Sequence, residues 1–168
     1  DFAPFSINAH ANAVYNPFAR LQEAITLEDY HKARMVADPI NLLDASPTGD
    51  GAAALYLVAA ETLRRGARQI ITIAGSASAT DSIAVHSRRD STWLSAAELS
   101  ANKAYQQASV GPMDIDVFEL HDAFSIMSAL SLEACGFAER GQGPRLGLEG
   151  QITPSGRIPI CTRGGLKA

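Results

Sequence analysis

Cysteine, aromatic residues and long hydrophobic runs are all scarce in this sequence. Two cysteines occur in 168 residues, Cys135 and Cys161. Neither has a CxxC partner or a histidine at ligand spacing, so we expect neither a disulfide framework nor a metal site. No apolar run approaches the roughly 20 residues that a membrane-spanning helix needs. These absences predict a cytoplasmic protein, kept in a reducing compartment and without a membrane span.

Positive charge is the next scarcity. The chain has 14 Lys and Arg against 18 Asp and Glu, a formal net charge of -4 and a pI of about 5.5. This balance argues against nucleic acid as the main partner. Neither GxGxxG nor GxxxxGK[ST] occurs, so the usual nucleotide-phosphate loops are excluded. What remains, 46% hydrophobic and 19% charged residues, is typical of a globular domain.

The spacing of apolar residues predicts three main helices, over residues 2–14, 95–109 and 123–134. Thr26 and Asp29 have the spacing of a capping box, which predicts an additional short helix. Ser95 and Glu98 have the same spacing at the start of the second main helix. We expect Asp122 to cap the helix that begins at about residue 123.

Strands are predicted where β-branched or small apolar residues form short runs. Such runs lie at 49–61, 68–77, 115–120 and 157–161. Between the first two we expect a helix from about Ala60 to Arg65. The alternation of strands and helices predicts an α/β layer fold with a mainly parallel or mixed sheet.

His121 is the most informative candidate for a functional residue, because it stands at the exit of the predicted strand 115–120. Ligands of open α/β sheets gather beyond the carboxyl ends of the strands. Beside the positive end of the next helix, an imidazole that donates a hydrogen bond could help to form an oxyanion site. The alternative interpretation is that His121 is an ordinary turn residue.

The other candidates have simpler interpretations. Asp50 is expected to be a turn residue, and Glu119 a paired or edge-facing residue. Both cysteines are expected to be structural thiols, although Arg163 beside Cys161 could lower the pKa of that thiol. Three further histidines have no partner at a telling spacing, and the first to check is His10, in NAHANA.

The stretch DIDVFELHDAFS resembles the thiolase superfamily. Within it, the HDxF motif at 121–124 resembles the branch of sterol-carrier-type thiolases and archaeal acetyl-CoA acetyltransferases. Three more segments agree in order with this branch: NAHANAVYNPFA (8–19), ADPINLLDASPTGDGAAA (37–54) and GGLKA (164–168). The last resembles the lead into the GHP loop of the family. Together these segments span nearly the whole chain, and they resemble the C-terminal portion of such a protein.

The resemblance implies a thiolase-like layered αβαβα fold, present here as a fragment. Residues 1–38 correspond to the end of the loop domain, residues 39–59 to the linker and the last strand of the N-terminal half, and residues 60–168 to a truncated C-terminal half. The acylated cysteine is expected upstream of Asp1, and the GHP histidine and a second cysteine beyond Ala168. We therefore expect these 168 residues alone to be inactive.

The resemblance also implies a chemistry, namely that of an acyl-CoA C-acyltransferase. Such an enzyme condenses acyl-CoA units or thiolyses a 3-ketoacyl-CoA through a cysteine acyl-enzyme. His121 matches the motif position that helps to form an oxyanion site, and Ser46 matches a position near the pantetheine arm of coenzyme A. Acyl-CoA is then a substrate, no cofactor is bound permanently, and the whole protein is expected to be a homodimer or tetramer.

Two alternatives remain open at this stage. The same branch includes retro-aldolases that cleave β-hydroxyacyl-CoA with a small helper protein. A non-catalytic relative would bind acyl-CoA or lipid without turnover. The residue at the nucleophile position, outside these 168 residues, would separate the three.

Overall fold

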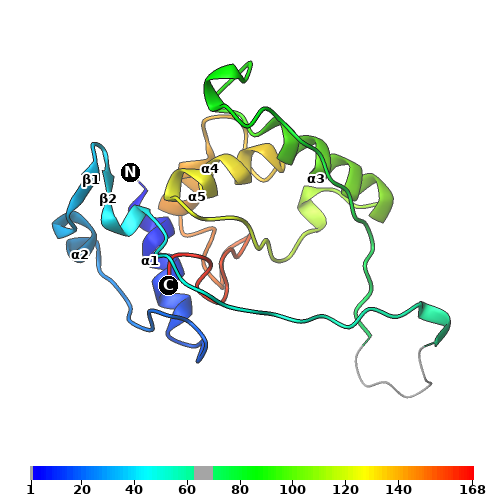
Figure 1. Ribbon diagram of the computed structural model, residues 1–168, viewed down its shortest axis with the longest axis horizontal. Helices are drawn as coiled ribbons and strands as arrows, with labels where there is room; N and C mark the ends of the chain where they lie inside the picture. Colours follow the sequence, from blue (N-terminus) through cyan, green and yellow to red (C-terminus); the bar gives the residue numbers. More distant parts are fainter. Residues whose placement is uncertain (1, 63–69) are drawn as a thin grey trace.

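The computed structural model describes residues 2–62 and 70–168 (Figure 1). Its packed body is built from α1 (Ala3–Ala13), α4 (Ser125–Ala134), α5 (Gly143–Leu148) and the segment that follows α5. These elements share one hydrophobic cluster, which is formed by Phe5, Ala9, Ala129, Leu132, Ile152, Ile158, Ile160 and Cys161. Because the cluster joins both ends of the sequence, the body depends on contacts between distant segments.

Helix α1 confirms the helix predicted over 2–14. Pro4 lies in its first turn, where a proline costs no backbone hydrogen bond. The helix is buried on more than one face, and its polar side chains are satisfied by the C-terminal segment. The amide of Asn8 donates to the carbonyl of Ile160 at 3.1 Å, and that of Asn12 donates to the carbonyl of Cys161 at 3.1 Å. These bonds fix α1 against residues 160–161.

Helix α4 confirms the helix predicted over 123–134, and a buried carboxylate joins it to α5. Oε1 of Glu133 accepts a hydrogen bond from the backbone N–H of Gly143 at 2.8 Å. A side chain at position 143 would not fit, because a Cβ there would lie 2.4 Å from the carbonyl oxygen of Ala129. The glycine therefore allows the close approach of the two helices.

The segment after α1 contains the short helix α2 (Leu27–Lys32) and a hairpin. The capping box between Thr26 and Asp29 is confirmed in both directions. Strands β1 (Met35–Ala37) and β2 (Ile40–Asn41) pair antiparallel, and the 3-10 turn η1 (Leu42–Asp44) follows. The hydroxyl of Tyr30 donates to Oδ1 of Asp44 at 2.8 Å, so α2 is tied to η1.

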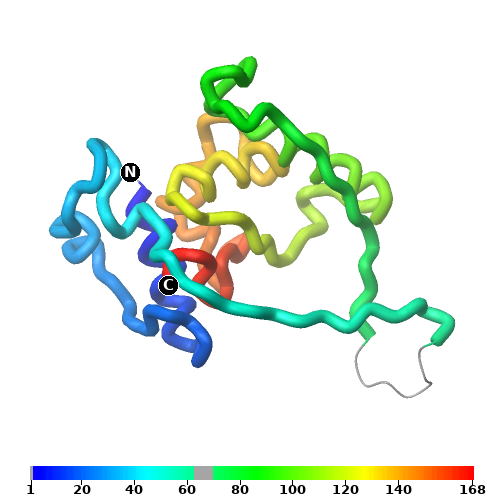
Figure 2. Tube along the Cα trace, viewed as in Figure 1, coloured from blue at the N-terminus to red at the C-terminus, as the bar shows by residue number. Residues whose placement is uncertain are grey.

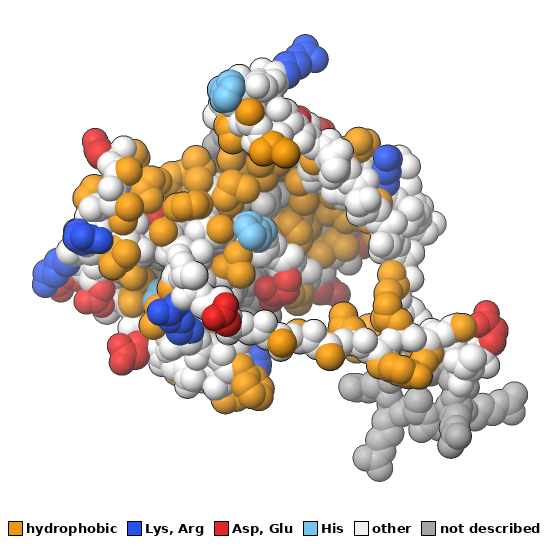
Figure 3. Space-filling view, in the orientation of Figure 1, with side chains coloured by type: hydrophobic (Ala, Val, Ile, Leu, Met, Phe, Trp, Pro, Cys, Tyr) orange, Lys and Arg blue, Asp and Glu red, His pale blue; other side chains and the backbone are white. Residues whose placement is uncertain are grey.

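Residues 49–62 and 70–84 are extended over most of their length, and we call these two stretches the arm (Figure 2). It leaves the body, passes through the 3-10 turn η2 (Ala60–Thr62) and returns beside α3 (Ser95–Ala108). The backbone N–H of Ser76 donates to Oε1 of Gln107 on α3 at 2.7 Å. Hydrophobic side chains lie in the open along the arm (Figure 3).

The strands predicted at 49–61 and 68–77 are wrong for the residues that the structure describes. Neither run pairs with another strand there, and Leu55 and Ile71 are 90% and 94% exposed. A strand needs a neighbour for its backbone groups, and the described part of the chain supplies none. Of the helix predicted from Ala60 to Arg65, only η2 is present, and the rest lies outside the described residues.

Helix α3 confirms the helix predicted over 95–109, but its start differs from the prediction. Ser95 is the first helical residue, and Leu94 before it provides no side-chain cap. Glu98 instead accepts a hydrogen bond from the indole N–H of Trp93 at 2.8 Å. The predicted capping box is therefore wrong, because the Glu98 carboxylate accepts from the Trp93 indole and not from the backbone at the start of the helix.

The strands predicted at 115–120 and 157–161 reduce to a single parallel bridge between Phe118 and Ile160. The backbone N–H of Phe118 donates to the carbonyl of Pro159 at 2.9 Å. The 3-10 turns η3 (Val85–Ser87) and η4 (Pro112–Asp114) complete the elements. Within residues 2–62 and 70–168, then, the only named strands are those of the β1–β2 hairpin, and the predicted larger sheet is not formed.

Candidate active site

Two of the segments singled out in the sequence meet on the body. Ala45 and Phe124 form an antiparallel bridge, and the backbone N–H of Ser46 donates to the carbonyl of Ala123 at 2.9 Å. Ser46 and the HDxF motif at 121–124 are therefore neighbours in space. The structure brings together the segments that carry the two predicted site residues, Ser46 and His121.

The side chain of His121 is exposed. It has no hydrogen-bond partner in the part of the chain that the structure describes. Ser46 next to the motif is half-buried. An exposed imidazole on fixed backbone can donate a hydrogen bond to an oxygen atom of a ligand, which is the chemistry expected of an oxyanion site.

Asp122 has a different place from the predicted one. Helix α4 begins at Ser125, its cap residue is Phe124, and no side chain caps it. The carboxylate of Asp122 is fully buried and accepts a hydrogen bond from the backbone N–H of Leu166 at 2.7 Å. The prediction that Asp122 caps the helix is wrong, because the C-terminal segment provides the donor that the carboxylate uses.

Glycine makes this contact possible. A Cβ on Gly165 would lie 2.4 Å from Oδ2 of Asp122, and the residue has a φ of +60°. Oδ2 of Asp122 itself accepts no hydrogen bond from the described N–H and O–H groups. The backbone at position 165 thus lies directly against a buried carboxylate.

Lys167 is the second buried charge of this region, with a side chain that is 1% exposed. Its Nζ donates to the carbonyl of Asp122 at 2.7 Å and to the carbonyl of Asp44 at 3.4 Å. Burial lowers the pKa of Lys167, while the Asp122 carboxylate, the Cys161 thiolate form and the Asp44 carboxylate oppose that change. The sequence analysis singled out the segment GGLKA (164–168) but assigned no role to its lysine, because the contacts of Lys167 join segments that are far apart in the chain.

A pair of hydroxyl groups links the same two chain segments through helix α1. Ser6 on α1 donates to the carbonyl of Leu43 at 2.6 Å, and its oxygen lies 3.0 Å from that of Ser125 at the start of α4. Since the Ser6 proton is directed to Leu43, Ser125 is the donor to Ser6. The chain of bonds links α4, α1 and η1.

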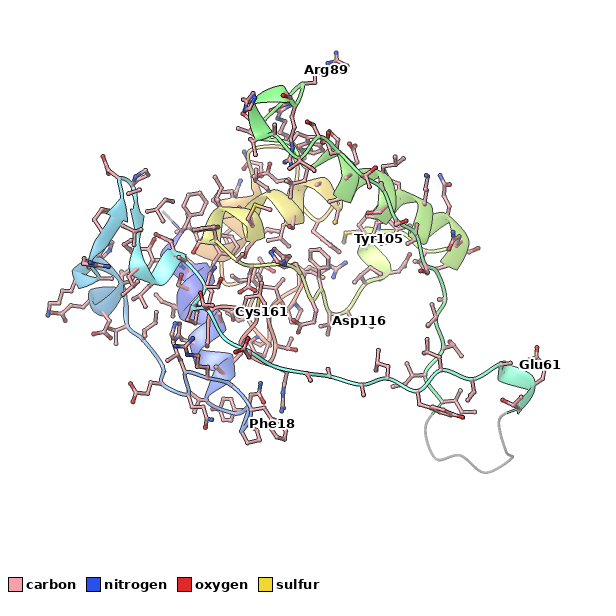
Figure 4. The ribbon with its side chains drawn as sticks, viewed as in Figure 1. Phe18, Glu61, Arg89, Tyr105, Asp116 and Cys161 are labelled. Atoms are coloured by element: carbon pink, nitrogen blue, oxygen red, sulfur yellow. The ribbon has the colours of Figure 1, made fainter. Side chains whose placement is uncertain are left out.

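Both cysteines are buried and free, which confirms them as structural thiols. Burial raises the pKa of Cys135 to about 11. Burial raises the pKa of Cys161 still further, with the Asp122 carboxylate as the next cause. The lower pKa expected from Arg163 is therefore wrong. Figure 4 shows Cys161 within the packed body, where it belongs to the hydrophobic cluster.

The remaining candidates are resolved by their contacts. His10 is buried, and its Nδ1 lies 3.1 Å from the carbonyl of Glu23, to which it donates. Burial lowers the pKa of His10, so the neutral ring is favoured. Glu119 is paired, since its Oε1 accepts the backbone N–H of Thr162 at 2.8 Å. Asp50 is exposed.

No described helix is both long and apolar enough to cross a membrane. Among the same residues, no group of three or more His, Cys, Asp or Glu side chains is arranged to hold a metal ion.

Known proteins resemble this chain along almost its whole length. It is 42% identical over 166 residues to the acetyl-CoA acetyltransferase of Methanothermobacter thermautotrophicus, which covers 99% of this chain and 43% of that protein. It is 32% identical over 170 residues to sterol carrier protein 2 of Rattus norvegicus, which covers 98% of this chain and 31% of that protein. The chain thus spans less than half the length of these curated relatives.

A solved structure and a family profile agree with these relatives. An Ltp2-ChsH2(DUF35) aldolase superposes with a TM-score of 0.87 and 27% sequence identity, over 99% of this chain and 45% of that one. The profile described as thiolase C-terminal domain-like matches residues 77–168. The predicted fold class is confirmed: the fold is thiolase-like, with mixed helix and strand content. The chain belongs to the thiolase superfamily, in a branch that includes archaeal acetyl-CoA acetyltransferases and sterol carrier protein 2.

Proposed function

We propose that the protein to which this chain belongs is an acyl-CoA C-acyltransferase, which thiolyses a 3-ketoacyl-CoA or condenses acyl-CoA units. The names of its archaeal relatives support this reaction. The observation that carries the proposal is the hydrogen bond from the Ser46 N–H to the Ala123 carbonyl. It holds the HDxF motif beside Ser46 while the His121 ring stays exposed.

In this proposal the two residues have separate tasks. His121 donates a hydrogen bond to the thioester oxygen as negative charge develops on it, which lowers the barrier. Ser46 lies along the pantetheine arm of coenzyme A. The acyl group is carried by a cysteine outside these 168 residues, because the thiols of Cys135 and Cys161 are buried and protonated at neutral pH.

The same proposal assigns the parts of the chain and its setting. Residues 1–38 belong to the end of a loop domain, 39–59 to the linker and last strand of the first half, and 60–168 to the second half. The profile match at 77–168 supports the last assignment. Acyl-CoA is the substrate without a permanent cofactor, the whole protein is a homodimer or tetramer, and its location is cytoplasmic, where two free thiols are stable.

The test is acetoacetyl-CoA thiolysis by the protein that contains this chain, with His121→Ala as the decisive variant. Loss of one oxyanion donor typically lowers kcat by about 10²-fold or more, and we expect that loss here. His86→Ala is the matched control, because His86 is an exposed histidine in η3. Its kcat should equal that of the unmodified protein, and both variants should keep the same melting temperature.

Two results would contradict the proposal. An unchanged kcat in a folded His121→Ala protein removes His121 from the mechanism. Binding of coenzyme A without any turnover, and without acylation of a cysteine by acetyl-CoA, identifies a binding protein rather than an acyltransferase.

A second function has one specific observation in its favour, namely the superposition on an aldolase. In that case the substrate is a β-hydroxyacyl-CoA, the reaction is a retro-aldol cleavage, and a small helper protein takes part. Cleavage of such a substrate with no thiolysis of acetoacetyl-CoA would favour this alternative.

A further inference from the structure

We propose that Lys167 is a positioning residue for the acyl-CoA site. It holds the HDxF segment and the Ser46 segment in place relative to each other by donating hydrogen bonds to their backbone carbonyls. This inference rests on the proposed function for its kinetic consequence. Its structural content is independent of the reaction, because it concerns which contacts keep two chain segments together.

The ammonium group of Lys167 contacts two backbone oxygen atoms. One is the carbonyl of Asp122, the residue after His121, and the other is the carbonyl of Asp44, two residues before Ser46. The same two segments contact each other through the bond from the Ser46 N–H to the Ala123 carbonyl. Lys167 therefore donates hydrogen bonds to both segments close to the point where they meet.

A buried ammonium group is costly unless it is paired, which makes its location informative. The side chain of Lys167 is 1% exposed, and the carboxylates of Asp44 and Asp122 are buried in the same region. Both carboxylates favour the charged form of Lys167. The ammonium group offers three donors, and the carbonyls of Asp122 and Asp44 accept from it.

The two acidic side chains are already oriented by other bonds. The Asp44 carboxylate accepts from the Tyr30 hydroxyl and the Asn41 backbone, and the Asp122 carboxylate accepts from the Leu166 backbone. Lys167 binds their main-chain carbonyls instead. It therefore restrains the backbone conformation of the two segments, and through the backbone it restrains the orientation of the neighbouring side chains.

The first test reads the structure without using activity. In the protein that contains this chain, Lys167→Met should accelerate hydrogen exchange at the Ser46 amide by at least about 10-fold, since its bond to Ala123 loosens. The Phe118 amide, which bonds Pro159, should exchange at its original rate. Lys103→Met, at an exposed position of α3, should change neither rate. An unchanged Ser46 rate, or equal acceleration of both amides, overturns the proposal.

The second test is a double-mutant cycle in kcat. A displacement of a catalytic group by about 1 Å costs up to about 10²-fold in rate, and we expect Lys167→Met alone to lower kcat by about 10-fold or more. In a His121→Ala background the same substitution should cost no further activity, because Lys167 acts through the His121 segment. Independent, multiplying losses would mean a general effect on the fold and would overturn the proposal.

Two provisions keep the result decisive. If Lys167→Met does not fold, Lys167→Arg is measured in the same ways, because it keeps the charge and displaces the donors. If the unmodified protein shows no acyl transfer, the proposed function is wrong, and the amide exchange of Ser46 against Phe118 still decides the role of Lys167.

Discussion

The body and the arm contain similar apolar residues, yet those residues have opposite surroundings. Ile152 in the body is 0% exposed, while Ile71 in the arm is 94% exposed. The body residue shares one cluster with residues of α1, at the other end of the chain, and of α4. In the arm, Ile71 belongs to no such buried cluster among the described residues. The comparison shows that an apolar residue stabilises a fold only where the chain also supplies the surface against which it packs.

The largest expected effect comes from truncating matched isoleucines in the two regions of the 168-residue chain. Ile152→Ala should lower the free energy of unfolding by about 2–5 kcal/mol, because it leaves a cavity in the core. Ile71→Ala should change it by about 0.5 kcal/mol or less, as for other exposed positions. Denaturant unfolding of both variants measures the difference, and a large loss for Ile71→Ala would show that the arm is packed in solution.

A smaller effect is expected from crowding the body at Gly165. Gly165→Ala adds a Cβ against the Asp122 carboxylate, and such overpacking costs about 1–3 kcal/mol in addition to the cost of the positive φ. Gly150→Ala is the control for that second cost, because Gly150 has a φ of +71° and open space around it. Thermal unfolding should show Gly165→Ala as the less stable variant, and equal melting temperatures would contradict the close contact.

The smallest effect is a pH dependence that separates a buried histidine from an exposed one. Because the pKa of His10 is lowered from 6.5 in the folded chain, the unfolded chain binds more protons as the pH falls through that value. Stability from this group is therefore present at pH 7 and is lost toward pH 5, by at most about 1.4 kcal/mol for each pH unit. His10→Asn, whose amide can still donate to the Glu23 carbonyl, should reduce this loss.

His86 provides the matched control for that titration, because its side chain is exposed in the turn after the arm. His86→Asn should follow the unmodified chain at every pH. Stability measured by urea unfolding at pH 7, 6 and 5 makes the comparison. Identical curves for all three proteins would show that His10 does not titrate differently on unfolding.

Local sequence signals predicted the helices because each helix carries its own hydrogen bonds. The spacing over 2–14 and 95–109 and the pair Thr26 and Asp29 all gave the right element. The strands failed for the converse reason: residues 49–61 have the composition of a strand, but pairing depends on a partner. Even a correct helix can begin with an unpredicted contact, as with Trp93 and Glu98.

The candidate site was predictable only as far as its motif. The HDxF segment and Ser46 could be chosen from the sequence, and the structure shows that their segments touch. The role of Asp122 was not predictable, because the donor to its carboxylate is the Leu166 amide, far along the chain. Lys167 lies in the selected segment GGLKA, but its role was not predictable for the same reason, since burial of a lysine depends on residues that are distant in the sequence.

The bonds from Asn8 and Asn12 to the carbonyls of residues 160 and 161 have a consequence for biosynthesis. During translation, α1 is made before the segment whose carbonyls accept from these amides. The two amides therefore lack these partners until nearly the whole region has been synthesised. Contacts of such long sequence separation slow folding, and the waiting surface is open to association with other chains. Helix α1 is translated before the rest of this region, yet it is thus among the last parts of the body to be completed.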